Sequence, residues 1–395
     1  MSVVGIIAEF NPFHLGHKYL LDRVADIYDC VVCVLSGNFV QRGDVSIVSK
    51  QARTKMALYG GADLVIELPV AWSMTTAQNF ALGGVSLLKN LGSVDAIAFG
   101  SECGDIEQLK TAAAALNSQG FKSSIESQLN SGKTFAAARQ EALASILFDK
   151  ADVLNKPNNT LAAEYIGAAD RIGFSPEFVT YKRLGANHNA LSPTDETASA
   201  ELIRSFIKQG NLDGALDYMD EQAYVVLYNE HKEGRIADID NLQTAIIANL
   251  RLADKKTFSS LPDLSEGIEN RLISFVKSAS SLNDLYSLVK TKRYTMARIR
   301  RLVLSAFLQI DNSFFGKTPP YIKVLGFNQK GEQLLKKSAK TAKIPIVCRS
   351  KDIAALDSFS KSVFVCECRA TDIFALSTAA PLPCGLEYTE KIIKV

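Results

Sequence analysis

Short apolar runs alternate with longer amphipathic stretches along the first hundred residues. The runs are rich in β-branched residues and are continuous rather than alternating, which indicates strands buried on both faces of a parallel sheet. In the stretches between them, apolar residues recur every three to four positions, as on one face of a helix. We therefore predict an α/β domain that begins with strands over residues 3–10, 30–37, 63–70 and 94–102 and helices over 18–28, 49–62 and 75–92.

The pattern changes after this first unit. Residues 105–150 are polar-rich and helical, and we interpret them as an insertion or cap. A helix, a fifth strand and another helix then complete the α/β domain, which we expect to span residues 1–210. Residues 211–395 are predicted to be mainly helical and to end in a small α/β addition. The later elements are expected over 155–173, 177–185, 191–210, 321–327, 330–343 and 344–350.

The amino-acid composition adds little to this predicted fold, but it excludes some classes of protein. The 395-residue chain is 47% hydrophobic and 22% charged, which is ordinary for a globular protein of two domains. Its net charge of +2 gives no field over the whole molecule, so nucleic acid would have to bind a local basic patch. We expect a cytoplasmic protein, because the sequence shows neither a signal-peptide pattern nor a membrane-length apolar run.

The seven cysteines, an odd number, indicate a reducing compartment. We expect all of them to be plain thiols, and we predict no metal site. Cys30 and Cys33 lie in a predicted strand, where residues three apart point to opposite faces. Cys366 and Cys368 are expected to share one face of a strand within VFVCECRA, but no second pair complements them.

The most informative short motif is His14-Leu15-Gly16-His17, which holds two of only four histidines directly after the first predicted strand. In a doubly wound sheet, ligands bind beyond the carboxyl ends of the strands, where the N-terminus of the next helix favours phosphate. Gly16 lets the backbone approach a ligand, and two imidazoles can donate hydrogen bonds to phosphate oxygens during displacement at an α-phosphorus. The alternatives are histidines with structural hydrogen bonds and a zinc pair, for which no third ligand stands nearby.

Longer stretches extend this motif. In chain order they are GIIAEFNPFHLGHKYLL, SGNFVQRGDVSIVSKQARTKMAL, GADLVIELP, FGSECGD, KPNNTLAAEY and TASAELIR (197–204). H-x-G-H after a first strand resembles the nucleotidyltransferase superfamily, and the whole set resembles the tRNA(Met) cytidine acetate ligase family. The resemblance implies a Rossmann-like nucleotidyltransferase domain that activates acetate with ATP, with Mg²⁺ expected beside the nucleotide. It also implies that the acetyl group passes to N4 of the wobble cytidine of elongator tRNA(Met), with AMP and pyrophosphate released.

The resemblance further implies which residues act. His14 and His17 would be catalytic. The last motif departs from the family's usual S-A-T-x-I-R at Glu201, where a hydroxyl residue is usual. Turn, capping or solvated roles remain alternatives for Gly100, Asn158 and Lys182. The residues implied to bind the nucleotide are Ile7, Ala8, Glu9, Phe10, Asn11, Pro12, Phe13, His14, Leu15, Gly16, His17, Lys18, Tyr19, Leu20, Gly100, Asn158, Asn159, Lys182, Arg183, Ser199 and Arg204.

Three basic stretches are candidates for binding the tRNA, of which KKSAKTAK (336–343) is the weaker alternative to the first. KTKRYTMARIRR (290–301) combines six cations with a tyrosine and no acid, which suits phosphate contacts and base stacking. The helix over 49–62 carries three more cations near its start. A solvated helix face is the alternative for each. The predicted tRNA contacts are Lys50, Arg53, Lys55, Lys290, Lys292, Arg293, Tyr294, Arg298, Arg300 and Arg301.

Two other functions stay open at this point. One is a small-molecule adenylyltransferase on the same fold, although a small substrate does not need the long C-terminal half. The other is a non-catalytic RNA-binding protein with a retained nucleotide pocket, although His14, Gly16 and His17 are all present. The sequence does not reveal a dedicated general base for acetyl transfer, and it does not fix the oligomeric state.

Overall fold

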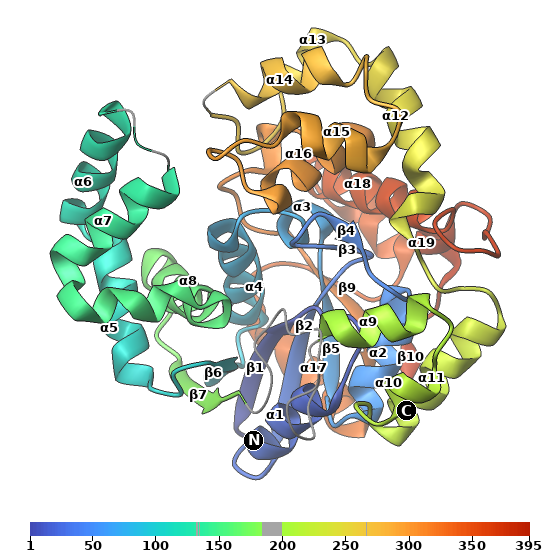
Figure 1. Cartoon of the computed structure of the whole chain (residues 1–395). Coiled ribbons are helices and arrows are strands. Elements are labelled where there is room, and N and C mark those ends of the chain that lie inside the picture. The colour runs from blue at the N-terminus through green and yellow to red at the C-terminus, as the bar shows by residue number, and fades with distance from the viewer. Residues whose placement is uncertain (132, 134, 184–199, 266) are drawn as a thin grey trace.

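The protein is described here from a computed structural model. Figure 1 shows the whole chain as a ribbon. The structure describes residues 1–131, 133, 135–183, 200–265 and 267–395.

A parallel sheet forms the centre of the molecule, and it confirms the predicted α/β class. Its five parallel strands lie in the order β5-β2-β1-β6-β7, with the first strand in the middle. Each strand falls within a range expected from the sequence. The bounds are β1 Val3–Ala8, β2 Cys30–Ser36, β5 Leu64–Leu68, β6 Ala96–Ser101 and β7 Glu177–Lys182.

The C-terminal strands belong to the same sheet. We predicted a small α/β addition at the end of the chain, and its first strand, β8 (Ile322–Phe327), pairs antiparallel with β5 and extends the central sheet. The short strands β9 (Ile346–Val347) and β10 (Ile393–Lys394) then pair with β8. This pairing was not predicted, because local periodicity identifies a strand but not its partner. The sheet therefore joins the two ends of the chain.

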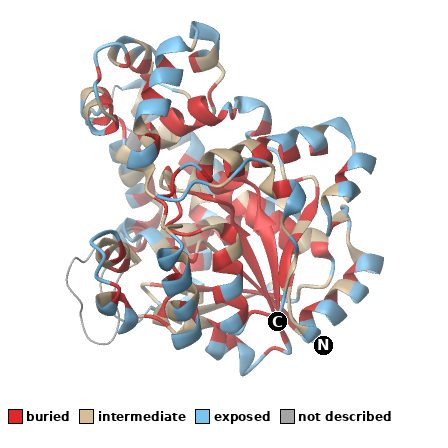
Figure 2. Ribbon diagram, turned by 90° about the vertical axis from the view of Figure 1, so that its right-hand side faces the viewer, coloured by how far each residue is buried: buried red, intermediate tan, exposed pale blue. Residues whose placement is uncertain are grey.

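Hydrophobic cores cover the sheet on both faces, which explains the continuous apolar runs. In β2, Val32 and Val34 point into one core, whereas Val31, Cys33 and Leu35 point into the other. Figure 2 shows the strands as the most continuously buried part of the molecule. One face is covered by α4 (Ala77–Leu91) and α8 (Pro157–Ile172), and the other by α1 (Leu15–Ala25), α2 (Lys50–Tyr59), α9 (Ala200–Lys208) and α11 (Glu221–Lys232).

Two helical regions flank this centre. The expected insertion forms α5 (Ile106–Asn117), α6 (Gln119–Asn130) and α7 (Phe135–Leu147), which project to the left in Figure 1. A second helical region lies above the sheet in the same view. It comprises α12 (Gln243–Leu252), α13 (Lys255–Ser259), α14 (Ile268–Phe275), α15 (Leu282–Val289), α16 (Met296–Leu308) and α18 (Ser358–Phe374).

Cys366 and Cys368 lie on α18, so the strand expected around them was wrong. Asp357 caps this helix by accepting a hydrogen bond from the Ser360 N–H at 2.8 Å. All seven cysteines are free thiols. Among the described residues, no helix combines the length and the apolar character needed to cross a membrane.

Candidate active site

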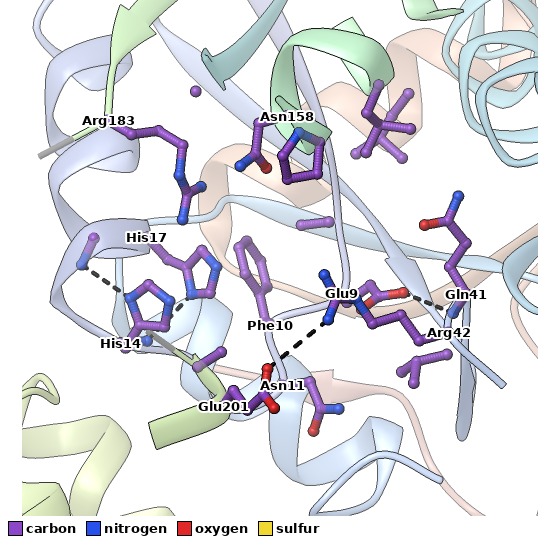
Figure 3. Close-up of a pocket in the computed structure, with 18 of the residues that line it drawn as sticks. Glu9, Phe10, Asn11, His14, His17, Gln41, Arg42, Asn158, Arg183 and Glu201 are labelled. Carbon is purple, nitrogen blue, oxygen red and sulfur yellow. Dashed lines mark hydrogen bonds and ion pairs between the residues drawn. The ribbon is translucent and has the colours of Figure 1, made fainter. Parts of the chain in front are cut away.

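A cavity of about 750 Å³ opens at the carboxyl ends of β1 and β6. From β1 the chain first adds β2 and β5 on one side and later adds β6 and β7 on the other side. This reversal is the topological switch point at which doubly wound sheets bind ligands. The H-x-G-H loop, the end of β6 at Gly100 and the N-terminus of α8 all line the cavity. Figure 3 shows a close-up of these side chains.

The two histidines hold each other and the start of α1. His14 is the N-cap residue, and its Nδ1 accepts a hydrogen bond from the Gly16 N–H at 3.1 Å. The Nδ1 of His17 accepts one from the His14 N–H at 3.3 Å, which completes a reciprocal capping box. A Cβ at Gly16 would lie 2.9 Å from Cε1 of His14, so the close approach of the ring requires glycine there.

These contacts fix the tautomers. Because both Nδ1 atoms act as acceptors, each neutral ring carries its hydrogen on Nε2. Burial lowers the pKa of His17 well below its usual range, and the nearby His14 and Arg183 lower it further. The rings stack with centroids 3.7 Å apart. At neutral pH His17 is therefore a neutral N–H donor on the cavity wall rather than a cation or a base.

Cations surround this donor pair. Arg183 follows β7, where its N–H donates to the Ser101 carbonyl at 2.9 Å, and its side chain lies above His17 in Figure 3. Arg204 on α9 donates from Nη1 to the Asn11 carbonyl at 2.7 Å and so braces the H-x-G-H loop. Burial lowers the pKa of both guanidinium groups, yet they stay charged because arginine titrates far above neutral pH. The remaining cations of the cavity wall are Arg42, Lys156, Lys182, Lys208 and Arg300.

Three carboxylates also line the cavity. Glu9 directly follows β1, and its Oε1 accepts a hydrogen bond from the Gln41 N–H at 2.8 Å. Burial raises the pKa of Glu9, against the opposing effects of the Gln41 amide and of nearby arginines. Asp44 lies on the hairpin of β3 (Phe39–Val40) and β4 (Asp44–Val45), and Glu201 lies 3.9 Å from Arg42. Cations and neutral donors thus outnumber acids around the space, as a triphosphate requires.

Comparisons with known proteins agree with this geometry. The HIGH Nucleotidyl Transferase family matches residues 1–383. A Thermoanaerobacter protein named tRNA(Met) cytidine acetate ligase is 37% identical, with all of both chains covered. A Clostridium perfringens protein of the same name is 38% identical over 95% of each chain.

This chain belongs to the tRNA(Met) cytidine acetate ligase family.

The family assignment extends to the three-dimensional structure. The crystal structure of apo TmcAL from Thermotoga maritima matches with a TM-score of 0.95 at 32% identity, over all of both chains. A second crystal form of that protein, bound with alpha-thio ATP, matches with a TM-score of 0.92 at 31% identity. The fold is therefore shared with a relative whose crystal structure is bound with alpha-thio ATP.

Most residues predicted to bind the nucleotide in this ligase-family chain do line the cavity. Pro12, Phe13 and Lys18 do not, because Pro12 and Phe13 are buried beneath the loop and Lys18 pairs with Asp22 along the outside of α1. Ser199 lies outside the described residues. Those at the cavity are Ile7, Ala8, Glu9, Phe10, Asn11, His14, Leu15, Gly16, His17, Tyr19, Leu20, Gly100, Asn158, Lys182, Arg183 and Arg204.

The structure distinguishes the two asparagines at the start of α8. Asn159 is buried, and its Oδ1 accepts hydrogen bonds from the N–H groups of Glu102 and Cys103 at 2.9 and 3.2 Å. Its Nδ2 donates to the Val153 carbonyl, so Asn159 holds the loop after β6 and is not among the residues that line the cavity. Asn158 lines the cavity, although its Nδ2 also donates to Glu102 at 2.8 Å.

Two predicted tRNA contacts on α2 were wrong. Lys50 and Arg53 have no exposed surface. Lys50 pairs with Glu67, Glu367 and Glu387. Arg53 donates to the carbonyls of Glu9, Ser36 and Gly37, which ties α2 to the ends of β1 and β2. Only Lys55 of this group is exposed.

The predicted tRNA contacts over 290–301 also divide into residues that are buried or paired within the protein and residues that are exposed. Tyr294 is only 4% exposed, so the predicted base stacking was wrong. Arg298 and Arg301 lie 3.5 and 3.7 Å from Asp263, and Lys290 donates to backbone carbonyls. Arg300 lines the cavity, whereas Lys292 and Arg293 are exposed.

Sequence reasoning missed the hairpin of β3 and β4 as a cavity wall. Its turn is held on α16 through Gly43, whose φ is +75° and where a Cβ would lie 2.6 Å from the Arg301 backbone nitrogen. Arg301 also donates to the Gln41 carbonyl at 3.3 Å. The stretch VQRGDV between apolar residues was the available signal for a glycine turn.

Proposed function

We propose that this chain activates acetate with ATP as acetyl-adenylate and transfers the acetyl group to N4 of the wobble cytidine of elongator tRNA(Met). The products are N4-acetylcytidine, AMP and pyrophosphate. The observation that carries the proposal is the pair of histidine Nε2–H donors on the wall of an arginine-rich cavity at the switch point of the sheet. The family assignment supports the identity of the acyl donor and acceptor.

In the first step, an acetate oxygen attacks the α-phosphorus of ATP and pyrophosphate leaves. Acetate is already ionised at neutral pH, so this step needs charge stabilisation rather than a base. His14 and His17 donate to oxygens on which charge develops, and Arg183 and Arg204 balance the charge of the leaving pyrophosphate. The neutral state of His17 suits this role because its Nδ1 can accept from the His14 N–H, which fixes the ring while Nε2–H stays a donor.

Mg²⁺ remains a prediction. The residues that line the cavity are suited to an Mg²⁺ ion that enters bound to ATP, and not to an ion held by the protein alone. Among the described residues, three metal-ligating side chains come within 4.8 Å of one another only at Glu67, Glu367 and Glu387, where lysines are already paired. When bound, Mg²⁺ would neutralise phosphate charge, and it would be held by the phosphates themselves. The arginines of the cavity perform the same task from the protein side.

For the tRNA, we retain Lys55, Lys292, Arg293 and Arg300 as candidate contacts. Arg300 links the tRNA candidates to the chemistry, because it lies on α16 and also lines the cavity. Lys292 and Arg293 precede the same helix and are exposed. The anticodon loop would then approach between the hairpin and α16, with the target cytidine unstacked so that N4 reaches the anhydride.

The test is incubation with ATP, labelled acetate and unmodified elongator tRNA(Met), followed by isolation of the tRNA. We expect label in the tRNA only when both ATP and acetate are supplied. A tRNA(Met) transcript with uridine at the wobble position is the matched control, because it lacks the accepting amine. Absence of label with correctly folded protein would reject the proposal. Pyrophosphate exchange driven by a phosphorylated metabolite instead of acetate would favour a small-molecule adenylyltransferase.

A further inference from the structure

The cavity has two chemically distinct ends. The histidines and Arg183 form one end, which suits the nucleotide, and Asn158 lies above Phe10 in Figure 3. Gln41, Arg42 and Glu9 form the other end, on the opposite side of Phe10 in Figure 3. Val45, Phe80 and Tyr165 add apolar and aromatic surface to the cavity wall. Burial raises the pKa of Tyr165, and Glu9 lies near enough for its carboxylate to raise that pKa further. A flat base with a polar edge fits such a combination of apolar walls and one carboxylate.

Acetyl transfer requires a proton acceptor that the nucleotide end does not provide. The exocyclic N4 of cytidine carries two hydrogens and must lose one when it becomes an amide. The Nε2 atom of His17 already carries a hydrogen, because its Nδ1 accepts from the His14 N–H. The arginines and lysines of the cavity are donors only at neutral pH. A carboxylate is the remaining class of acceptor on the cavity wall.

Glu9 is held in a position to act as this proton acceptor. Its backbone carbonyl accepts from Arg53 Nη1 at 2.7 Å, and its Oε1 accepts from the Gln41 N–H at 2.8 Å. No hydrogen-bond donor among the described residues reaches its Oε2. The carboxylate therefore has a fixed orientation and one oxygen available to a ligand, and it directly follows the strand that leads into the H-x-G-H loop.

We propose, building on the proposed function above, that Glu9 binds the N4 amine of the target cytidine and receives its proton during acetyl transfer. Oε2 accepts a hydrogen bond from N4 before the attack. The N4–C bond to the acetyl carbon forms, the bond from that carbon to the phosphate oxygen of AMP breaks, and AMP leaves with the electron pair. The N4 proton moves to Glu9 and then to water. A uridine in the same place would present O4 to the carboxylate and would be repelled, which explains the choice of cytidine.

The other two carboxylates of the cavity are less suited. Glu201 is 43% exposed in its side chain and lies beside Arg42 at the rim. Asp44 Oδ1 accepts from the Val45 N–H, and its carboxylate faces Lys208, Arg300 and Arg204. Burial raises the pKa of Glu9, and also that of Asp44, toward the range in which a general base works best near neutral pH. The charged and titratable groups that face it are Arg204, Arg53, Arg42 and Tyr165.

The test compares Glu9→Gln with wild type in the two half-reactions. Glutamine keeps an oxygen for the Gln41 amide, so the hairpin contact survives while the proton acceptor is lost. We expect acetyl transfer to tRNA(Met) to fall by about 10²–10⁴-fold, and acetate-dependent ATP–pyrophosphate exchange to fall by at least about tenfold less than transfer does. Glu126→Gln, an exposed position on α6, is the matched control and should leave both rates unchanged.

A pH profile separates catalysis from structure. Wild-type transfer should decline as pH falls through a pKa above the usual glutamate value of about 4.3, because a protonated Glu9 accepts no proton. In Glu9→Gln this limb should vanish from the residual rate. Equal loss of exchange and transfer, or a selective loss in Asp44→Asn but not in Glu9→Gln, would overturn the inference. Failure of the wild-type protein to label tRNA would instead reject the proposed function.

Discussion

Two regions of this molecule gather many charged side chains, and they use them in opposite ways. The first is a sealed group that we call the ionic cluster, formed by Lys50, Glu67, Lys323, Glu367 and Glu387. Four of its five side chains are at most 1% exposed, and each charge lies against an opposite one. The second is the cavity, where arginines, lysines and histidines surround about 750 Å³ of space. Buried charges that pair with one another organise the fold, whereas charged side chains that surround an open cavity indicate a ligand-binding site.

The ionic cluster and the cavity also differ in how burial changes the pKa values of their side chains. In the ionic cluster, burial raises the pKa of Glu367 to about 7, and the neighbouring Glu67 adds to this. Burial acts on Glu67 in the same direction, but Lys323 and Lys50 hold its pKa at about 2. The raised pKa of Glu367 therefore favours its protonated form in a cluster where three carboxylates face two lysines. In the cavity, burial instead keeps His17 neutral, so its Nδ1 can accept from the His14 N–H while its Nε2–H remains a donor.

The largest effect is expected from Lys50→Met. This change leaves buried carboxylates without their central cation, and breaking a buried pair in this way costs about 3–5 kcal/mol of unfolding free energy. Urea titration followed by circular dichroism measures the loss. Lys55→Met, an exposed residue on the same helix, is the control and should cost less than about 0.5 kcal/mol. Similar stability for the two variants would mean that the ionic cluster does not organise the fold.

Two matched variants of His17 test whether its Nε2–H donor supports catalysis in the cavity. Asparagine can keep the Nδ1-like acceptor for the His14 N–H but removes the donor, whereas glutamine places a donor near Nε2. We expect acetate-dependent exchange to fall about 10²–10³-fold in His17→Asn and to recover in part in His17→Gln. Unfolding free energies should stay close to that of wild type. If the two variants lose activity equally, the Nε2 donor is not what the cavity supplies.

Sequence reasoning succeeded where the signal is local. The five parallel strands and the H-x-G-H loop follow from short-range periodicity and from the geometry of a strand that leads into a helix. It failed where partners are distant. Lys50 is 317 positions from Glu367, so nothing near it in the chain indicated that its charge is neutralised.

The helix around Cys366 was a different kind of error, because its signal was present. The buried positions Ser360, Val363, Glu367, Ala370 and Phe374 follow helical spacing. The β-branched residues between them obscured this period. The wall formed by Gly43 and α16 could not be predicted from either segment alone, because it depends on contact between two remote parts of the chain.

The ionic cluster also predicts a pH dependence of stability. The folded pKa of Glu367 lies above that of an unfolded glutamate, so its contribution to stability is present below about pH 4.3 and is lost as pH rises through about 7. Glu67 acts with the opposite sign, because its contribution is lost as pH falls toward 2. Glu367→Gln mimics the protonated acid and keeps an oxygen for the Val70 N–H. We expect this variant to remove the decline between pH 5 and 8, by on the order of 1 kcal/mol in urea titrations, and an unchanged profile would contradict the proton assignment.

The smallest effect concerns the cations that belong to neither region. Lys292 and Arg293 are exposed before α16, while Arg298 and Arg301 of the same stretch are paired with Asp263. Lys292→Glu and Arg293→Glu should each weaken tRNA(Met) binding about threefold to tenfold and reduce its salt dependence, because each removes one phosphate contact. Filter binding at several salt concentrations measures both quantities, and ATP–pyrophosphate exchange should not change. Lys361→Glu, exposed on α18, provides the control. Equal weakening in all three variants would mean that the tRNA responds to overall charge, and the approach beside α16 would then lose its support.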